Sequence, residues 1–312
     1  MPRRRLTWVA ATFCLGASLV WPGWFQGVAA GAAPLPASAE AAPLPAFGEA
    51  AVFPAAEGAA ALPASAEAAS PGAVPSDTVP PAWLAGLWYE RELISSDLPG
   101  WSDWTGIRAS AMRDLRWGAL GLELFRAERF GLRDLGGSLD GYLELWERAY
   151  ANVRVRVTPG ADVLPGIDLR GELFQAWPGG WEVSGSGWWM DFPEHDAGVV
   201  GVGIARYLGS WYFRETVTLG TLAGESALST SLLARRYLDP PREYLEVSGG
   251  VGREVVVLGA GPTVDVRDTR FLRGGLQKFL TRSWGLSAAL QYHRFQGTPS
   301  RRGGSLGVLA RF

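Results

Sequence analysis

The sequence contains little cysteine, histidine and lysine. Of its 312 residues, one is cysteine, two are histidine and one is lysine. The cysteine, Cys14, lies in an apolar segment near the N-terminus that we expect to be removed, so the mature chain has no thiol. This absence excludes disulfides, cysteine metal sites and cysteine nucleophiles. Paired histidine spacings and cofactor motifs are also missing, so we expect no catalytic residue, no metal and no cofactor.

Long apolar runs are missing as well, apart from one short N-terminal segment. Residues 1–5 (Met-Pro-Arg-Arg-Arg) are basic, and residues 6–20 are apolar but too short to span a bilayer comfortably. This pattern predicts a signal peptide over residues 1–30. Phe13 precedes Cys14 where lipoprotein processing needs a small residue, so we expect no lipid anchor. Because no later run of 18 apolar residues exists, a membrane-bound chain must cross as a closed barrel.

Residues 31–82 consist almost entirely of Ala, Pro, Gly, Ser and Glu. The phrase Leu-Pro-Ala-Ser-Ala-Glu-Ala-Ala occurs at residues 35–42 and again at 62–69. Repeated proline prevents the alanine runs from forming one long helix. We expect a disordered linker, which is either a periplasmic tether or a product of low-complexity drift.

From Trp83 onward, apolar and polar residues alternate one by one, as in strands with two different faces. Residues 153–157 and 167–173 show this alternation most clearly. Turn signals divide the region into about fourteen strands, with twelve as the alternative count, and the strand lengths suit a tilted membrane span. The expected strands are 87–97, 104–115, 118–129, 136–148, 151–158, 166–176, 181–192, 197–207, 210–220, 226–237, 243–255, 263–279, 283–295 and 303–312.

The connections between these strands alternate in length. Residues 116–117, 177–180 and 208–209 form tight turns, whereas connections such as 96–103 and 158–165 are longer. With both chain ends on the periplasmic side, every short connection falls on that side. Short periplasmic turns that alternate with longer outer loops are typical of outer-membrane barrels.

A soluble β-sandwich or propeller would show the same alternation. The membrane barrel is favoured because the apolar positions are mainly Leu, Val, Ala and Gly, and because tryptophans fall near strand boundaries, as aromatic girdles require. We therefore predict an all-β, antiparallel transmembrane barrel over residues 83–312, in the bacterial outer membrane and in contact with its lipid and lipopolysaccharide. The boundary tryptophans are Trp83, Trp88, Trp101, Trp104, Trp117, Trp146, Trp177, Trp181, Trp211 and Trp284.

The last expected strand carries a more specific pattern. Leu306, Val308 and Ala310 alternate in phase, and the sequence ends on Phe312. This pattern resembles the C-terminal assembly signal of bacterial outer-membrane proteins, which implies the barrel assembly machinery as a partner. We expect these side chains to face lipid and Arg311 to face inward.

Several segments resemble the YaiO family of outer-membrane β-barrel proteins. They are residues 125–134 (Phe-Arg-Ala-Glu-Arg-Phe-Gly-Leu-Arg-Asp), 206–211 (Arg-Tyr-Leu-Gly-Ser-Trp) and 232–237 (Leu-Leu-Ala-Arg-Arg-Tyr), the last continuing to Tyr244 and the glycine-rich residues 249–252. The similarity extends over most of residues 87–312 and leaves out the linker. It implies a barrel in the outer membrane and brings no defined biochemical activity with it.

The inward face of the expected barrel is charged. Residues 83–312 hold 26 basic and 26 acidic residues, so no net charge selects cations or anions. Either paired charges fill or narrow the lumen, or opposed acidic and basic walls line a wet channel. No basic patch suggests nucleic-acid binding. The strand phase points these residues into the lumen: Glu123, Asp140, Glu144, Arg154, Arg156, Asp168, Arg170, Glu172, Glu182, Arg214, Arg235, Glu246, Arg273, Gln277 and Arg311.

The sequence thus predicts a structural or pore-type barrel that is not an enzyme, with envelope or polysaccharide export as the pathways to consider and no specific protein partner identified. The alternative is an outer-membrane hydrolase that uses His195 in an outer loop or His293, whose phase points inward. Arg301 and Arg302, expected in the last outer loop, are candidate contacts for lipopolysaccharide phosphate.

Overall fold

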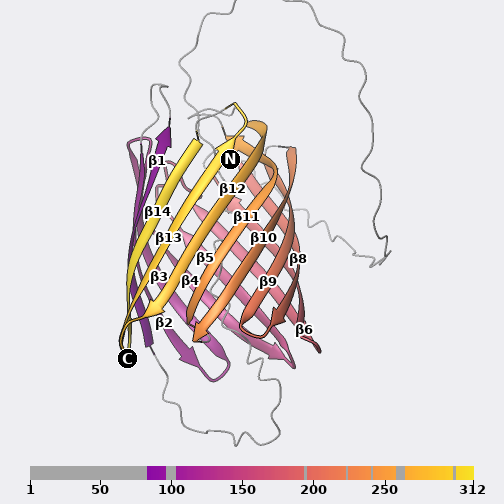
Figure 1. The fold of residues 1–312 in the computed structure, drawn as a ribbon. Coiled ribbons are helices and arrows are strands. Elements are labelled where there is room, and N and C mark those ends of the chain that lie inside the picture. The colour runs from indigo at the N-terminus through magenta and orange to yellow at the C-terminus, as the bar shows by residue number, and fades with distance from the viewer. Residues whose placement is uncertain are drawn as a thin grey trace, which may run out of the picture. The chain divides into compact units, whose positions relative to one another are not determined.

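The computed structural model describes residues 83–95, 103–192, 195–222, 224–239, 242–257, 264–297 and 300–312, so the expected signal peptide and linker lie outside the described residues. Neighbouring strands are antiparallel, and β1 pairs with β14, which closes the sheet into a barrel (Figure 1). The predicted antiparallel barrel of fourteen strands is confirmed. The strands are β1 (Trp83–Ser95), β2 (Trp104–Leu115), β3 (Gly118–Arg129), β4 (Leu132–Trp146), β5 (Ala149–Val157), β6 (Ile167–Trp177), β7 (Trp181–Asp191), β8 (Asp196–Leu208), β9 (Trp211–Leu222), β10 (Glu225–Asp239), β11 (Glu243–Val257), β12 (Val264–Phe279), β13 (Trp284–Phe295) and β14 (Ser300–Arg311).

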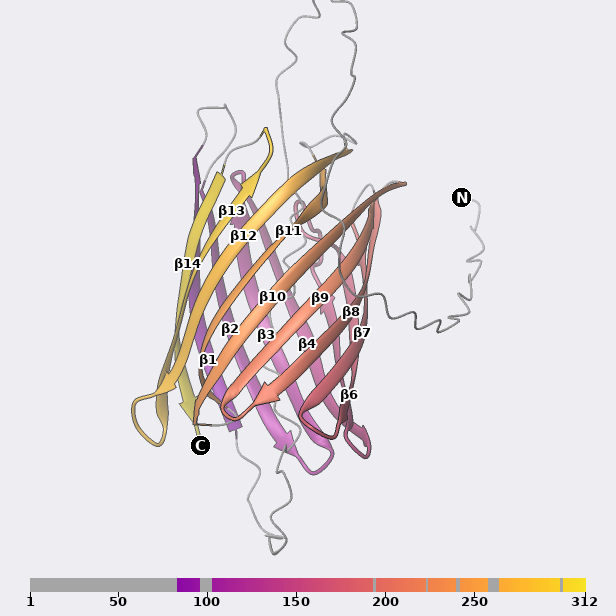
Figure 2. The same cartoon turned by 45° about the vertical axis from the view of Figure 1, so that its right-hand side comes forward.

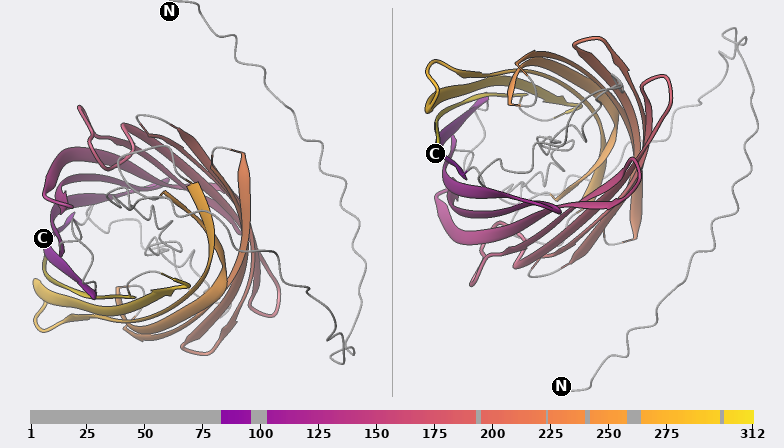
Figure 3. Two further views of the ribbon diagram at one scale, coloured as in Figure 1. Left: turned by 90° about the horizontal axis from the view of Figure 1, so that it is seen from above. Right: turned by 90° about the horizontal axis from the view of Figure 1, so that it is seen from below.

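The seam between β1 and β14 is complete. In register, Leu84 faces Arg311 at one end of the seam and Ser95 faces Ser300 at the other. Next to this register, the Trp83 N–H donates to the Phe312 carbonyl at 2.8 Å. A sheet closed in this way leaves no free edge for pairing with another chain. The strands run obliquely around the barrel (Figure 2) and form one ring when viewed along its axis (Figure 3).

The two ends of the barrel differ in their connections. β1 begins and β14 finishes at one end, which we assign as the periplasmic end because the turns at 116–117, 147–148 and 209–210 lie there. The long connections 96–103 and 158–166 lie at the other end, the outer end. No helix within the described ranges is long and apolar enough to cross a membrane.

Three strand starts differ from the sequence-based expectation by three residues or more. β1 begins at Trp83 instead of residue 87, and β14 begins at Ser300 instead of residue 303. β4 begins at Leu132 instead of residue 136, because Phe130 and Gly131 both adopt positive φ angles (54° and 78°) and form a two-residue hairpin turn. This turn lies at the outer end, so the expectation that every short connection is periplasmic is wrong.

The outward surface is apolar between two polar ends. Leucines such as Leu124 and Leu290 are exposed along the middle of the strands, as lipid contact requires. At the periplasmic end, the guanidinium of Arg206 lies 4.8 Å from the ring centre of Trp181, and that of Arg236 lies 5.7 Å from Trp211. An aromatic girdle is therefore present at this end, made of the exposed Trp83, Trp117, Trp146, Trp177, Trp181, Trp211 and Trp284.

Two of the boundary tryptophans do not belong to a girdle. Trp104 is buried, with Arg301 above its ring. The ring of Trp88 lies against Gly86 and Gly307, where any side chain would collide with it. Trp101 lies outside the described residues.

Candidate functional site in the barrel lumen

The structure places the expected lumen residues in several different environments. Glu182 is buried and hydrogen-bonded, Arg273 lines a cavity, and Gln277 donates to a backbone carbonyl. Glu144 is exposed near the periplasmic end of β4, and Arg311 stacks over Phe279 at 4.4 Å. The other ten form ion pairs: Glu123, Asp140, Arg154, Arg156, Asp168, Arg170, Glu172, Arg214, Arg235 and Glu246.

Charged side chains of β1, β2, β3, β5 and β6 form a chain of ion pairs along one wall. Arg108 on β2 pairs with Glu90 on β1 and lies 3.7 Å from Glu123 on β3. Arg156 on β5 lies 3.9 Å from Glu123 and 3.8 Å from Asp168 on β6. The partners lie on adjacent or next-but-one strands. The series of ion pairs therefore follows the barrel wall and does not cross the lumen. Opposite partners offset the cost of removing each charge from bulk water.

A second group of ion pairs continues this wall toward β9. Glu172 on β6 lies 3.7 Å from Arg170 and also pairs with Arg214 on β9. Arg214 reaches Glu172 across β7 and β8, and it donates to the Ser184 hydroxyl at 2.8 Å on the way. A Cβ atom at Gly203 on β8 would lie 3.0 Å from the Arg214 guanidinium. Glycine at this position therefore makes room for the ion pair.

Toward the periplasmic end, aromatic side chains fill the lumen around Glu182. Tyr150 and Tyr212 donate to the two oxygens of this carboxylate at 2.7 and 2.9 Å. Tyr150 stacks on Phe174 with 4.5 Å between ring centres, and Tyr207 packs against Tyr212 at 4.6 Å. All four rings are held by contacts with each other or with the carboxylate, so this part of the lumen is closely packed.

Arg235 and Glu246 extend the same packing to β10 and β11. Arg235 is buried and donates to Glu246 at 2.7 Å. Its guanidinium lies 4.3 Å from the ring centre of Tyr244 and 6.0 Å from that of Tyr237, distances at which a cation is attracted to the aromatic face. We call Tyr150, Tyr207, Tyr212, Tyr237 and Tyr244 the tyrosine layer.

An ion pair bridges the periplasmic mouth below the tyrosine layer. Arg242, in the β10–β11 turn, pairs with Asp114 near the end of β2. β2 and β11 are five strands apart around the closed sheet, so the pair joins distant parts of the rim. The turn is also held by Gln277, which donates to the Arg242 carbonyl at 2.8 Å.

The β5–β6 connection, residues 158–166, is held against the inside of the outer end. The Asp134 carboxylate on β4 accepts hydrogen bonds from the backbone N–H groups of Asp162, Val163 and Leu164 at 2.8, 3.0 and 2.7 Å. Leu164 is buried and lines the lumen. Three charge-assisted hydrogen bonds to one carboxylate fix the connection in place, and it narrows the lumen from the outer side.

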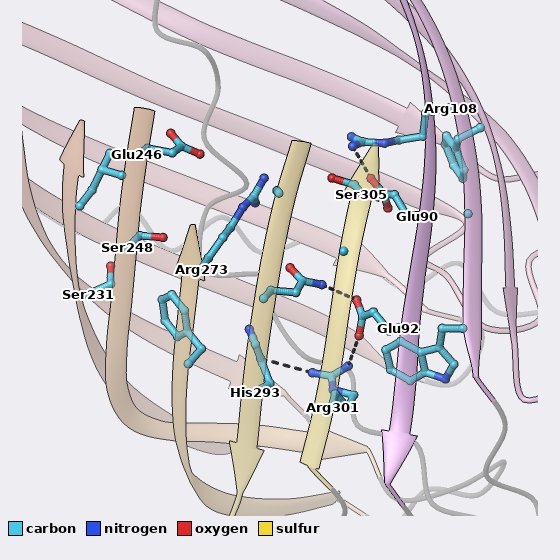
Figure 4. A pocket seen from close by; sticks show the side chains of 18 of the residues that line it. Glu90, Glu92, Arg108, Ser231, Glu246, Ser248, Arg273, His293, Arg301 and Ser305 are labelled. Carbon is cyan, nitrogen blue, oxygen red and sulfur yellow. Dashed lines mark hydrogen bonds and ion pairs between the residues drawn. The ribbon is translucent and has the colours of Figure 1, made fainter. Parts of the chain in front are cut away.

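A cavity of about 250 Å³ lies within the lumen, with Leu164 and Tyr212 among its lining residues. Part of its wall comes from β1, β13 and β14 (Figure 4). There Gln291 donates to one Glu92 oxygen at 2.7 Å, and Arg301 lies 3.7 Å from the other. The remaining walls add charges of both signs, aromatic rings and serine hydroxyls. The cavity therefore offers a small polar solute both hydrogen-bonding groups and aromatic faces.

The two histidines show no catalytic arrangement within the described residues. His293 lines the cavity, where its Nδ1 is 3.5 Å from Arg301 and its ring stacks near Phe271 at 5.3 Å (Figure 4). Among the described side chains, no carboxylate or hydroxyl group forms a hydrogen bond with this ring. His195 lies between β7 and β8, and its Nε2 has no hydrogen-bond partner among the described side chains. No cluster of three acidic, histidine or cysteine side chains able to hold a metal occurs in the described ranges.

The last strand separates Arg301 from Arg302. Because β14 begins at Ser300, both arginines belong to the strand. Arg301 occupies a lumen-facing position and is buried, whereas Arg302 is exposed on the outward face. The expectation that both lie in an outer loop is therefore wrong. On the same outward face, Leu306, Val308 and Phe312 are exposed, and Ala310 is half-buried.

Several residues of this site were not singled out from the sequence. Glu90, Glu92 and Arg108 belong to β1 and β2, where outward charges such as Arg91 blur the alternation. Asp134 is the last residue of the segment 125–134 that resembles the YaiO family. This resemblance was the one sequence signal that pointed to Asp134. Six of the eight tyrosines lie inside the barrel, and the other two, Tyr89 and Tyr292, are exposed on its outer surface. The residue type alone therefore does not predict which face of a strand a tyrosine occupies.

Comparison with known proteins agrees with this architecture. A model of the YaiO membrane β-barrel domain matches residues 85–255, which are 171 of the 312 residues and extend from β1 into β11. No curated protein matches the chain.

Solved outer-membrane proteins are similar at low sequence identity. An outer membrane channel from Pseudomonas putida F1 is 12% identical, with a TM-score of 0.48, over 77% of this chain and 100% of the channel. A bacterial polysaccharide outer membrane secretin is 11% identical, with a TM-score of 0.45, over 74% and 98% of the two chains. An anion-selective porin from Comamonas acidovorans is 10% identical, with a TM-score of 0.41, over 74% and 99%. By its family match, the chain belongs to the YaiO family of membrane β-barrels and is located in the bacterial outer membrane.

Proposed function

We propose that the protein is a non-enzymatic, pore-type barrel with a narrow, charge-balanced lumen that admits small polar solutes. The observation that carries this proposal is the cavity of about 250 Å³, which has ion-paired walls and is bounded by aromatic side chains toward the periplasm. Ligand sites for drug-sized molecules measure roughly 300–1,000 Å³. The lumen therefore suits one small solute and not the free flow of a general porin.

The arrangement of charge supports weak ion selectivity. Selective channels present rings of like charge to the permeating ion. Here acidic and basic side chains alternate along the wall, as in the series Glu90, Arg108, Glu123, Arg156 and Asp168. Cations and anions meet similar surroundings, so neither sign is excluded.

A role in envelope or polysaccharide export would require a wider lumen than the one described. A polysaccharide strand needs a continuous passage, whereas Glu182 holds Tyr150 and Tyr212 together in the path. A role in export therefore requires that the tyrosine layer opens. Opening involves separating Arg242 from Asp114 and breaking the hydrogen bonds to Glu182.

Single-channel conductance in a planar bilayer tests the proposal. We expect the wild-type barrel to conduct weakly, with similar permeability to potassium and chloride. Replacing both partners of the mouth-bridging pair, Asp114→Ala with Arg242→Ala, should raise the conductance severalfold. The matched control is Arg91→Ala with Asp103→Ala, which removes an exposed ion pair of 2.8 Å outside the lumen and should leave conductance unchanged.

Two results would contradict the proposal. One is a wild-type conductance as large as that of an open general porin. The other is an equal conductance of the wild type and the Asp114/Arg242 variant, because the mouth would then not limit flow.

A further inference from the structure

Three arginines project from the outward face near the outer end of neighbouring strands. They are Arg270 on β12, Arg294 on β13 and Arg302 on β14, and each is exposed. On these strands the lumen-facing residues, such as Arg273 and His293, lie at the alternate positions. The three guanidinium groups therefore share the surface that faces lipid.

The height of these arginines matches the far edge of the apolar band. Arg294 lies ten residues after Trp284, which belongs to the periplasmic girdle. Ten residues of a tilted strand rise about 25 Å along the membrane normal, the height of the apolar band of such barrels. Between them, Leu286, Leu290 and Tyr292 face outward. Arg294 is thus at the headgroup level of the outer leaflet.

Within the described part of the chain, the three arginines have no acidic partner. Arg270 and Arg294 are directly opposite each other in register, an arrangement of like charges that destabilises a sheet. Arg302 lies beside Tyr292 in register, with its guanidinium 5.8 Å from the ring centre. Among the described side chains no carboxylate forms an ion pair with any of the three. On the same face of β12, Asp268 is in register with another exposed arginine, Arg253.

Other outward charges at the outer end behave differently. Arg91 on β1 is paired with Asp103 at 2.8 Å, and the hydrogen bond from Arg91 holds the pKa of the Asp103 carboxyl below its ordinary value. On the opposite side of the barrel, Asp191 on β7 is in register with Asp196 on β8. The outer rim is therefore basic on β12–β14 and acidic on β7–β8.

We propose that Arg270, Arg294 and Arg302 form a binding site for the phosphate groups of an anionic lipid in the outer leaflet. Guanidinium groups bind phosphate oxygens through two parallel hydrogen bonds, and a phosphate between Arg270 and Arg294 relieves their repulsion. The exposed Leu290 and Leu306 lie below the arginines and offer an apolar surface to the acyl chains. This site is on the outside of the barrel and is independent of the proposed pore.

Binding of lipid A to the purified full-length barrel tests the site. The probes are bisphosphorylated lipid A, the same lipid without phosphates, and inorganic phosphate, each added in detergent with EDTA to remove bridging cations. We expect native mass spectrometry to show binding of bisphosphorylated lipid A alone. The variant Arg270→Ala with Arg294→Ala should bind this lipid at least tenfold more weakly, and adding Arg302→Ala should weaken binding further.

The control variant is Arg206→Ala with Arg236→Ala, which removes two outward arginines at the periplasmic girdle and should leave lipid A binding unchanged. Folding of every variant is checked by the mobility difference between boiled and unboiled protein. Equal binding by wild type and the Arg270/Arg294 variant would overturn the proposal. So would binding of the phosphate-free lipid, equal losses in the control, or competition by millimolar inorganic phosphate, which would identify a site for free phosphate.

Discussion

The outer and periplasmic halves of the lumen use polar residues in opposite ways. In the outer half, charges pair along the wall, as Arg156 does with Glu123 and Asp168, and a cavity remains beside them. In the periplasmic half, Tyr150 and Tyr212 converge on Glu182 from different strands and occupy the space itself.

This difference shows how one barrel combines a solute site with a barrier. Pairing along the wall satisfies charges without crossing the lumen, so water and a solute can enter. Convergence on a central carboxylate satisfies polar groups only when the lumen is closed, because an opened layer leaves buried hydroxyl groups without partners. The barrier is therefore stabilised by the same hydrogen bonds that must break when it opens.

The largest effect is expected from breaking a buried charge pair in the periplasmic half. Glu246→Ala leaves Arg235, which is 3% exposed, without its acidic partner. Stranding a buried charge destabilises a protein by about 3–5 kcal/mol. Urea unfolding in lipid vesicles, followed by tryptophan fluorescence, measures the change. Glu144→Ala, which removes an exposed carboxylate at the periplasmic end of β4, should cost less than about 0.5 kcal/mol. Similar costs for both variants would mean that the periplasmic half is as wet as the outer half.

A slightly smaller effect is expected on the lipid side of the wall. Leu122 is exposed to lipid at the middle of β3, beside the lumen residue Glu123. Leu122→Arg places a charge against hydrocarbon and should cost about 2–4 kcal/mol. Leu122→Ala keeps the surface apolar and serves as the control in the same unfolding assay. If the arginine variant were as stable as the alanine variant, the assignment of faces on β3 would be wrong by one residue.

Much of this wall was predictable from the sequence. On β3 to β6 strict alternation fixes the phase, so residues such as Asp168 and Glu172 were expected inward from the neighbouring leucines alone. Strand number followed from turn residues, because glycine and proline mark most of the connections.

What the sequence did not reveal depends on contacts between strands far apart. The pairing of Arg242 with Asp114 joins residues 128 positions apart, and nothing local links them. Arg301 was misplaced because glycines at residues 303 and 304 obscure the start of β14. Asp134 was missed as a ligand of the 158–166 connection because its partners are backbone N–H groups, which leave no side-chain signature.

A smaller effect is expected from removing a charge in the outer half. Glu92 accepts one hydrogen bond from Gln291 and lies 3.7 Å from Arg301 beside the cavity. Arg301 is also buried, but its distance of 3.7 Å to Glu92 is longer than the 2.7 Å between Arg235 and Glu246, and the Glu92 side chain is 23% exposed. Glu92→Ala therefore removes a weaker contact and should cost only about 1 kcal/mol. Glu92→Gln, which keeps an acceptor for Gln291, is the control and should cost less. A loss as large as that of Glu246→Ala would remove the distinction between the two halves.

The smallest effect on stability is expected at the chain end, where the two halves of the barrel are not involved. Phe312 is 76% exposed on the outward side of the closing strand, and apart from backbone hydrogen bonds with Trp83 it adds little to the sheet. If the terminal aromatic residue is recognised by the assembly machinery, deleting it lowers the amount of barrel in the outer membrane, while inserted molecules keep their unfolding midpoint and conductance.

Deleting residues 31–81 should leave insertion normal, because that segment precedes the first strand. A quantitative blot of outer-membrane fractions compares the two deletions with the wild type. Normal insertion without Phe312 would remove the assembly role of this residue, and poor insertion without residues 31–81 would show that the linker contributes to assembly.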